Sequence, residues 1–284
     1  MPASSTPGGP TPGSPTGPAP GRPSRRTLMA GLAAAVLTPT LGACGITPGG
    51  RGTSTRQGPT CVPAADTRTY ARLGTAGLQY EVNDRPITVR MEPGFAARLT
   101  AWFTDWCDLT GTAPDLVGTY GAWLPDDGSC DSWHHAGRAF DISRLATGGT
   151  ELVSCRYDRW GGTPTADRLS AYWALAASLH LHFAYVLTHL FDDAHANHIH
   201  VDNGVSGGGM STFTGRSRVQ HQAVQAICRQ LWGRDLPITG VWDTATRQAV
   251  NGLLGQLGLA GPLTRQESWQ GFLRASVRRW AEAR

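Results

Sequence analysis

Two separate stretches of the sequence contain residue types that bind metal ions. Residues 131–141 contain His134 and Asp141, and His198 and His200 follow further along the chain. Eight of the nine histidines fall between the first and the last of these histidines. Because zinc takes imidazole nitrogen and carboxylate oxygen as ligands in proteins, this concentration predicts a metal site divided between two segments. Taken singly, each of these histidines could instead be an ordinary core residue, and the aspartate could instead cap a helix or a turn.

The spacing of these residues indicates how the chain must run. His198 and His200 are two residues apart, so on a strand both imidazoles project from one face while the residue between them turns to the core. His134 and Asp141 would lie on opposite faces of an unbroken strand, so we expect a bend at Gly137 and a buried strand just after it. Two imidazoles and one carboxylate leave a tetrahedral cation one open position, as in catalytic zinc sites.

The pattern resembles the zinc signature of the D-alanyl-D-alanine metallopeptidases. Within that superfamily it is closest to the bacterial extensin-like C-terminal domain. The residues that carry the resemblance are Ser132-x-His134-x-x-Gly137-x-Ala139-x-Asp141 and Ala194-His195-Ala196-Asn197-His198-Ile199-His200-Val201-Asp202. The resemblance covers residues 80–205 and implies that His134, Asp141 and His200 bind zinc. It also implies that His198 takes a proton from water or steadies the tetrahedral intermediate.

The residue at the usual position of the general base departs from the family's pattern. Carboxypeptidases of the superfamily have a glutamate three residues before the last ligand, and this chain has Asn197 there. Since an amide cannot accept a proton, the base is expected to be His198 or a carboxylate such as Glu151 or Asp202. His198 alternatively only orients the site by hydrogen bonding.

The family's substrate-binding arginine is also not evident in its expected place. It would lie on the strand before the first ligand, at residues 115–123, which contain no arginine. Arg138 and Arg156 are therefore the candidates for binding a peptide carboxylate. His195 is a further candidate for contact with the substrate.

Length and charge limit the class of protein. The chain has 284 residues, of which 40% are hydrophobic and ten are tryptophan, which is enough for a real core. The formal net charge is +4, and three arginines but no acidic residue precede Cys44. A chain cleaved there would carry 22 basic and 21 acidic residues, or +1. This nearly neutral charge argues against a nucleic-acid partner, because such binding depends on neutralising many phosphates. Separately, we expect the protein to be a monomer.

The N-terminal residues are typical of an export signal. A twin arginine precedes a short, weakly hydrophobic run that resembles a Tat signal, and Leu41-Gly42-Ala43-Cys44 resembles a lipobox. We expect a signal at residues 1–44, a lipid on Cys44 and a flexible linker at residues 45–65. The protein would then be held at the outer face of the cytoplasmic membrane or in the cell wall. The alternative is a transmembrane anchor, but the run is short and broken by proline.

The cysteines are read as disulfide partners of an exported protein. Lipidation of Cys44 would leave five, an odd number, in a compartment where disulfides persist. The expected pairs are Cys130 with Cys155, which would brace the metal site, and Cys61 with Cys107. Cys228 would remain as a buried, unpaired thiol.

Hydrophobic patterns predict an α+β domain over residues 66–205, in which an antiparallel sheet and helices present a zinc cleft. The expected strands are residues 86–91, 115–123, 151–156, 182–190 and 198–202, and the expected helices are residues 93–109 and 166–180.

After a linker at residues 206–216, three helices are expected within residues 217–284. The motif Gly240-Val241-Trp242-Asp243-x-x-Thr246 resembles the small helical type of peptidoglycan-binding domain. The alternative is a generic helical cap that packs on the first domain.

Together these features lead us to expect an exported zinc hydrolase that cuts an amide in peptidoglycan stem peptides or cross-links. The alternative is a catalytically silent, extensin-like adaptor that binds the cell wall. The ligand types alone would also suit iron, and the resemblance is what favours Zn²⁺.

Overall fold

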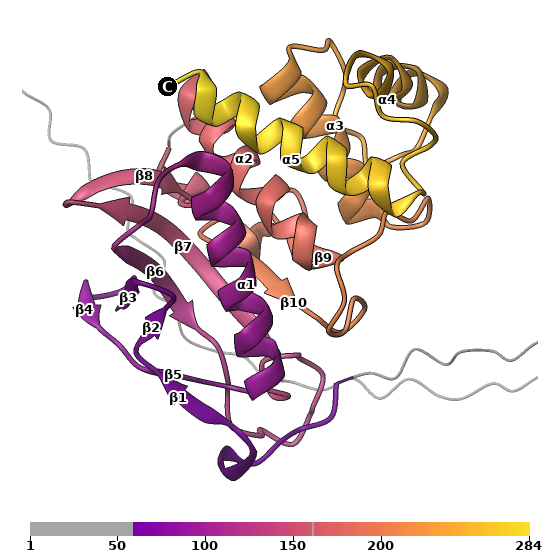
Figure 1. The fold of residues 1–284 in the computed structure, drawn as a ribbon. Coiled ribbons are helices and arrows are strands. Elements are labelled where there is room, and N and C mark those ends of the chain that lie inside the picture. The colour runs from indigo at the N-terminus through magenta and orange to yellow at the C-terminus, as the bar shows by residue number, and fades with distance from the viewer. Residues whose placement is uncertain (1–58, 161) are drawn as a thin grey trace, which may run out of the picture. The chain divides into compact units, whose positions relative to one another are not determined.

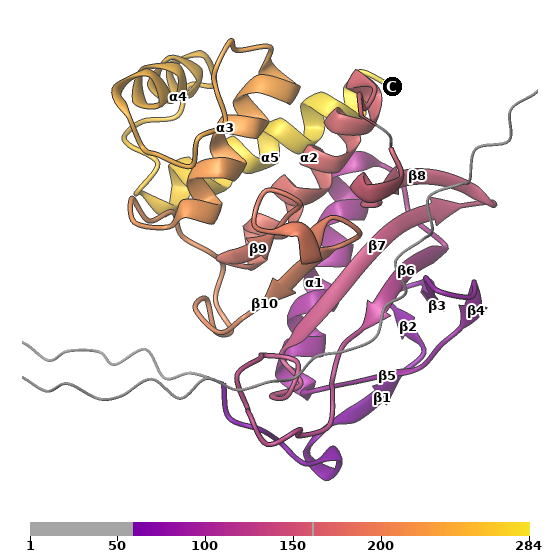
Figure 2. The ribbon, with the colours of Figure 1, turned by 180° about the vertical axis from the view of Figure 1, so that it is seen from behind.

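The computed structural model describes residues 59–160 and 162–284. The expected signal, Cys44 and most of the linker lie outside these residues. A mixed sheet forms one layer, and helices cover one of its faces (Figures 1 and 2). The α+β class expected from the sequence is therefore confirmed.

The main sheet has eight strands in the order β2-β3-β6-β7-β10-β9, with β4 paired to β3 and β8 paired to β7. Its strands are β2 (Arg72–Leu73), β3 (Ala76–Tyr80), β4 (Arg85–Pro86), β6 (Leu116–Gly121), β7 (Ala139–Thr147), β8 (Thr150–Ser154), β9 (Tyr185–Leu187) and β10 (Ile199–Asp202). A separate pair is formed by β1 (Arg68–Tyr70) and β5 (Val89–Met91). The expectation of an antiparallel sheet is corrected in one place, because β3 and β6 are parallel.

That parallel pair requires a crossover connection, which contains helix α1 (Pro93–Thr110). The Glu92 side chain accepts hydrogen bonds from the amides of Gly94 and Phe95 at 2.8 and 2.7 Å, and Gly111 ends the helix in the left-handed region. The aromatic side chains Trp102 and Trp106 of this helix are fully buried and belong to the hydrophobic core.

Helix α2 (Ala166–His182) follows Thr165, whose side chain accepts a hydrogen bond from the amide of Arg168 at 3.3 Å and so caps the helix. It ends later than expected. Its last residue, His182, is buried, and the Nε2 of this residue lies 2.9 Å from Asp105 Oδ2 of α1. The strand expected at residues 182–190 is therefore reduced to β9, and the strand expected at residues 86–91 is instead β4 and β5.

The three expected C-terminal helices are present as α3 (Arg218–Trp232), α4 (Thr244–Gln256) and α5 (Gln266–Glu282). They share one core with the preceding residues, and the described residues 59–160 and 162–284 belong to a single compact unit. The rings of Trp106 in α1 and Trp280 in α5 lie 5.4 Å apart, and Phe213 of the expected linker is buried. Helices α3 and α5 pack against α2, α5 also packs against α1, and α4 packs against α3, so α3, α4 and α5 form a helical layer on that side of α2 (Figure 1).

Candidate metal centre

The candidate ligands meet where β7 pairs with β10. His200 lies directly opposite Asp141 in the antiparallel register of these strands. Ile199 and Val201, on either side of His200, are fully buried in the core. The alternation expected for this strand is therefore confirmed, and it presents His200 on the face opposite the core residues.

His134 reaches the same place from a turn before β7. Gly137 in that turn has a φ of 65°, and a Cβ there would lie 3.0 Å from the amide nitrogen of Glu92. The expected bend is therefore present. Glycine is favoured at this position because the φ angle is positive and because there is little room for a Cβ. The Nδ1 of His134 is hydrogen-bonded to the carbonyl of Ala122, just beyond β6. This bond directs Nε2 towards Asp141 and His200.

Three atoms of these side chains form a compact triangle. His134 Nε2 lies 3.3 Å from Asp141 Oδ1 and 3.2 Å from His200 Nδ1, and the last two atoms are 2.9 Å apart. Three ligands of a tetrahedral zinc with bonds of about 2.0 to 2.1 Å are about 3.3 Å apart. The triangle therefore has the size that a small divalent cation needs.

Both histidines of the triangle have a partner on the ring nitrogen that faces away from it. His134 uses the Ala122 carbonyl, and His200 Nε2 lies 3.4 Å from Asp202 Oδ2. Asp202 is itself buried and accepts a hydrogen bond from the amide of Gly204 at 2.9 Å. Metal-binding histidines are commonly oriented in this way, so the surroundings fit a metal site as well as the triangle does.

The charges of the triangle are strongly coupled. Burial alone would raise the pKa of Asp141, but hydrogen bonds and charge from His134 and His200 outweigh it and hold that pKa well below its usual range. Burial alone would lower the pKa of His200, but Asp141 and Asp202 raise it to about 9. A carboxylate kept ionised beside two imidazoles is a suitable set of donors for a cation.

His198 lies beside the triangle without belonging to it. Its Nε2 is 3.5 Å from Asp141 Oδ1, and its Nδ1 lies 2.6 Å from Asn197 Oδ1. Burial lowers the pKa of His198 to about 4, with the nearby Asp141 opposing this shift. The ring of Tyr120 lies 5.8 Å away, a neighbour that no sequence signal marks beyond its place near the end of a strand. At neutral pH His198 is therefore an uncharged group at the edge of the candidate site.

The triangle opens into a cleft of about 410 Å³, which Trp133, Tyr185 and Leu187 line together with His195 and His198. His195 Nδ1 lies 2.6 Å from Asp192 Oδ1, and its ring is 5.1 Å from that of His198. His195 is thus placed to contact a ligand in the cleft.

The other sequence candidates lie outside the cleft lining. Arg138 Nε donates to Asn203 Oδ1 at 2.8 Å, and its guanidinium stacks on Trp133. Arg156 is buried and pairs with Glu81 at 2.7 Å. Glu151, considered as a base, is exposed on β8 beside a different hollow. Of the two carboxylates considered, only Asp202 is brought to the candidate centre.

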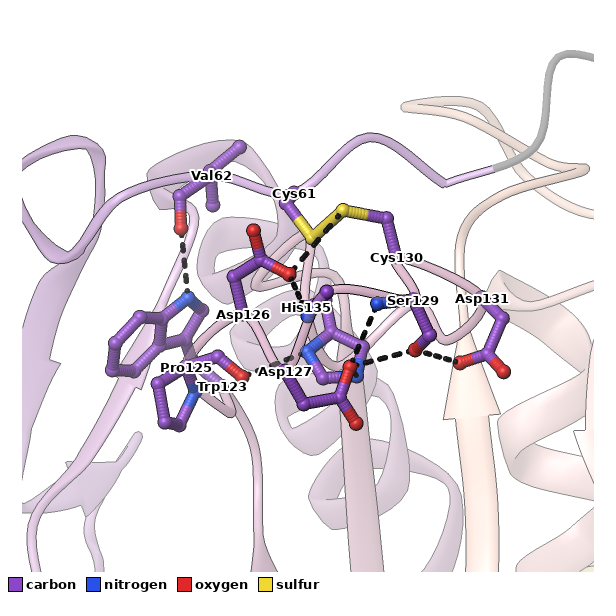
Figure 3. Close-up of a disulfide and its surroundings, with 11 residues drawn as sticks. Cys61, Val62, Trp123, Pro125, Asp126, Asp127, Ser129, Cys130, Asp131 and His135 are labelled. Carbon is purple, nitrogen blue, oxygen red and sulfur yellow. Dashed lines mark hydrogen bonds and ion pairs between the residues drawn. A yellow bond between two sulfur atoms is a disulfide. The ribbon is translucent and has the colours of Figure 1, made fainter.

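The disulfide differs from both expected pairs. Cys61 is bonded to Cys130, with an S–S distance of 1.93 Å and Cα atoms 5.3 Å apart (Figure 3). The expected bridges of Cys130 with Cys155 and of Cys61 with Cys107 are therefore wrong. Cys155 is fully buried in the core and Cys107 lies on α1, whereas Cys228 is a buried free thiol as expected.

The observed pairing follows from the path of the N-terminal segment, which runs along the turn that holds His134. The amide of Val62 donates to the carbonyl of His135 at 2.9 Å, and Trp123 Nε1 donates to the carbonyl of Val62 at 3.1 Å. Figure 3 shows these neighbours around the bridge. The disulfide therefore braces the turn that holds His134, from a partner that the sequence did not indicate.

Comparison with protein-family models, with curated proteins and with solved structures found no match for this chain. Within residues 59–160 and 162–284, no helix is both long enough and apolar enough to cross a membrane. Its function is therefore inferred from the residues described above.

Proposed function

We propose that this protein is an exported, zinc-dependent hydrolase that cuts an amide bond in the peptides of peptidoglycan. The observation that supports it most is the triangle of His134 Nε2, Asp141 Oδ1 and His200 Nδ1, with an uncharged His198 beside it at a cleft. This set provides ligands, a proton acceptor and space for a substrate in one place.

In this mechanism His134, Asp141 and His200 hold the zinc. When bound, zinc polarises the scissile carbonyl and lowers the pKa of water. Asp202 and the Ala122 carbonyl keep the two ligand imidazoles in the orientation that directs their free nitrogens to the triangle.

His198 manages the proton. Its hydrogen bond to Asn197 Oδ1 places the ring proton on Nδ1, which leaves Nε2 as an acceptor on the side of Asp141. Nε2 can take a proton from the attacking water and then donate it to the leaving amine. Asn197 thus serves as a positioning residue rather than as the base.

The choice of substrate rests on the sequence resemblances. The ligand pattern resembles D-alanyl-D-alanine metallopeptidases, the N-terminal residues resemble a lipoprotein signal, and the Gly240–Asp243 motif resembles a peptidoglycan-binding domain. A lipid at Cys44 would tether the enzyme to the membrane next to its substrate, and the helical layer would add wall affinity.

The test is hydrolysis of isolated cross-linked muropeptides by the purified chain with stoichiometric zinc. We expect cleavage that a chelator abolishes, that added zinc restores and that His198→Gln reduces at least about a hundredfold. Muropeptides that stay intact while a known peptidase digests them would reject this function.

A second candidate function is a wall-binding adaptor without turnover. The specific observation in its favour is Asn197, which takes the place where the related carboxypeptidases have their catalytic glutamate. Binding to isolated cell walls that is the same for the wild type and His198→Ala, with no hydrolysis by either, would favour the adaptor. Metal analysis in the same preparation would also decide between zinc and iron, since both take two histidines and a carboxylate.

A further inference from the structure

The cleft beside the triangle is acidic. Its lining contains three carboxylates, Asp131, Asp141 and Asp202, but no arginine, and the chain has no lysine. Asp131 is exposed at the rim, where its carboxylate accepts a hydrogen bond from Ser129 Oγ at 3.0 Å. A substrate carboxylate would therefore enter this cleft against a negative charge.

The arginine nearest in sequence to the ligands is not available to offset that charge. Arg138 donates to the side chain of Asn203 at 2.8 Å and to its carbonyl at 3.1 Å. Its guanidinium also lies 4.8 Å from the centre of the Trp133 ring. Arg138 is therefore engaged by Asn203 and by the ring of Trp133, which itself lines the cleft.

The second candidate, Arg156, is neutralised in place. It pairs with Glu81 at 2.7 Å and with Asp158 at 2.6 Å, and its side chain is 11% exposed. The neighbouring Arg159 lies 3.8 Å from Glu81, its side chain is 65% exposed, and it is not part of the cleft lining. A substrate carboxylate could recruit Arg156 only by displacing a buried ion pair, which is costly.

The rest of the lining suits an extended peptide. Trp133, Tyr185 and Leu187 form apolar walls, and Phe191, 42% exposed, continues the apolar surface edge-on to His195 at 5.2 Å. The cleft and its rim therefore offer apolar as well as polar surface to a bound peptide.

We propose that the cleft binds an amide inside a longer peptide and rejects one that is followed by a free terminal carboxylate. This rests on the proposed function and narrows it to endopeptidase action on cross-links, with carboxypeptidase action excluded. Asp131 further favours substrates that carry an amine near the scissile bond.

The test compares two ligands that differ only in terminal charge. N-acetyl-D-alanyl-D-alanine as the carboxamide and as the free acid is titrated into zinc-loaded His198→Ala protein by calorimetry. We expect the carboxamide to bind about tenfold more tightly or better. Equal binding, preference for the free acid or binding of neither ligand would overturn the inference.

A charge-reversal variant identifies the residue responsible. Asp131→Arg should improve binding of the free acid about tenfold and leave the carboxamide within about twofold. Asp108→Arg, which makes the same charge change at an exposed position on α1, should change neither. If both variants act alike, the discrimination is not made by the cleft and the inference fails.

Failure of this inference can be told from failure of the proposed function. If the carboxamide is preferred in binding but wild-type protein cuts no muropeptide, the hydrolase proposal fails and the inference about the cleft stands. If wild-type protein removes a terminal residue from the free acid, the hydrolase proposal stands and the inference is overturned.

Discussion

Asn197 Oδ1 lies 2.6 Å from His198 Nδ1, and the same imidazole places its Nε2 3.5 Å from Asp141 Oδ1. One side of the ring is thus held by a neutral amide and the other faces the candidate ligands. Because the amide carries no charge, it fixes the tautomer without stabilising the protonated form of His198. Burial lowers the pKa of His198 to about 4, and the amide of Asn197 does not counteract this lowering.

Replacing that amide by a carboxylate should change the pH dependence. In Asn197→Asp, a negative charge beside Nδ1 stabilises the imidazolium, so the pKa of His198 rises by about one unit or more. A base with a higher pKa is deprotonated only at higher pH, so the acidic limb of the kcat/KM profile moves upward. Asn197→Ala removes the hydrogen bond without adding charge and is the control. A limb that is unchanged in Asn197→Asp would show that His198 is not the base.

Metal binding should depend on the triangle and on its support. His134→Ala and Asp141→Asn should abolish stoichiometric metal, because each removes one of three ligands. Asp202→Asn should leave the ligands in place but weaken metal affinity about 10- to 100-fold, since it loses the partner of His200 Nε2. The measurement is metal content by mass spectrometry with competitive chelator titration.

His195→Ala is the matched control for these variants, because His195 lines the same cleft but lies outside the triangle. It should retain full metal occupancy. Equal loss of metal from His195→Ala and His134→Ala would contradict the assignment of ligands.

The disulfide should contribute substantially to stability. Cys61 and Cys130 are 69 residues apart, and closing a loop of that length stabilises the folded state by about 4 kcal/mol in the chain-entropy description. In the double variant Cys61→Ser/Cys130→Ser, the free energy of unfolding measured with urea should fall by most of this amount. Adding reductant to the wild type should lower it by the same amount. Cys107→Ser is the control, and a comparable loss from it would argue for a different pairing.

Acid should destabilise the fold through buried histidines. Burial lowers the pKa of His180 to about 4, against an ordinary value of 6.5. The folded state then favours the neutral ring, so this contribution is fully present above pH 6.5 and is lost as the pH falls from 6.5 towards 4. Once both folded and unfolded states bind the proton, this lowered pKa reduces the free energy of unfolding by about 3 kcal/mol.

The substitution His180→Leu should make the free energy of unfolding fall less steeply between pH 7 and 4.5. Both proteins should be measured by urea unfolding with the metal removed, so that loss of ligands at low pH does not contribute. Parallel curves for the two proteins would show that His180 does not titrate with unfolding.

The features that the sequence predicted are mainly local. The bend at Gly137 and the alternation of His198 and His200 around Ile199 both depend on neighbouring residues. Each follows from backbone geometry and side-chain direction, which short stretches determine.

The features that it did not predict depend on distant partners. Arg156 was a candidate for substrate binding, but it is paired with Glu81, 75 residues earlier in the chain, as well as with the nearby Asp158. The true partner of Cys130 likewise came from a segment with no pattern of its own. Nothing local to these residues indicates which distant group lies beside them, so only the fold could assign their roles.

The contact between the first and last helices also bears on the order in which the molecule can fold. Arg274 of α5 donates to Asp105 of α1 at 3.1 Å, across 169 residues of chain. Closing so long a loop is entropically expensive, and topologies dominated by distant contacts fold slowly. A nascent chain would therefore leave the surfaces of α1 and α2 that face α5 uncovered until α5 emerged from the ribosome. Exposed apolar surface of this kind makes a folding intermediate prone to aggregation.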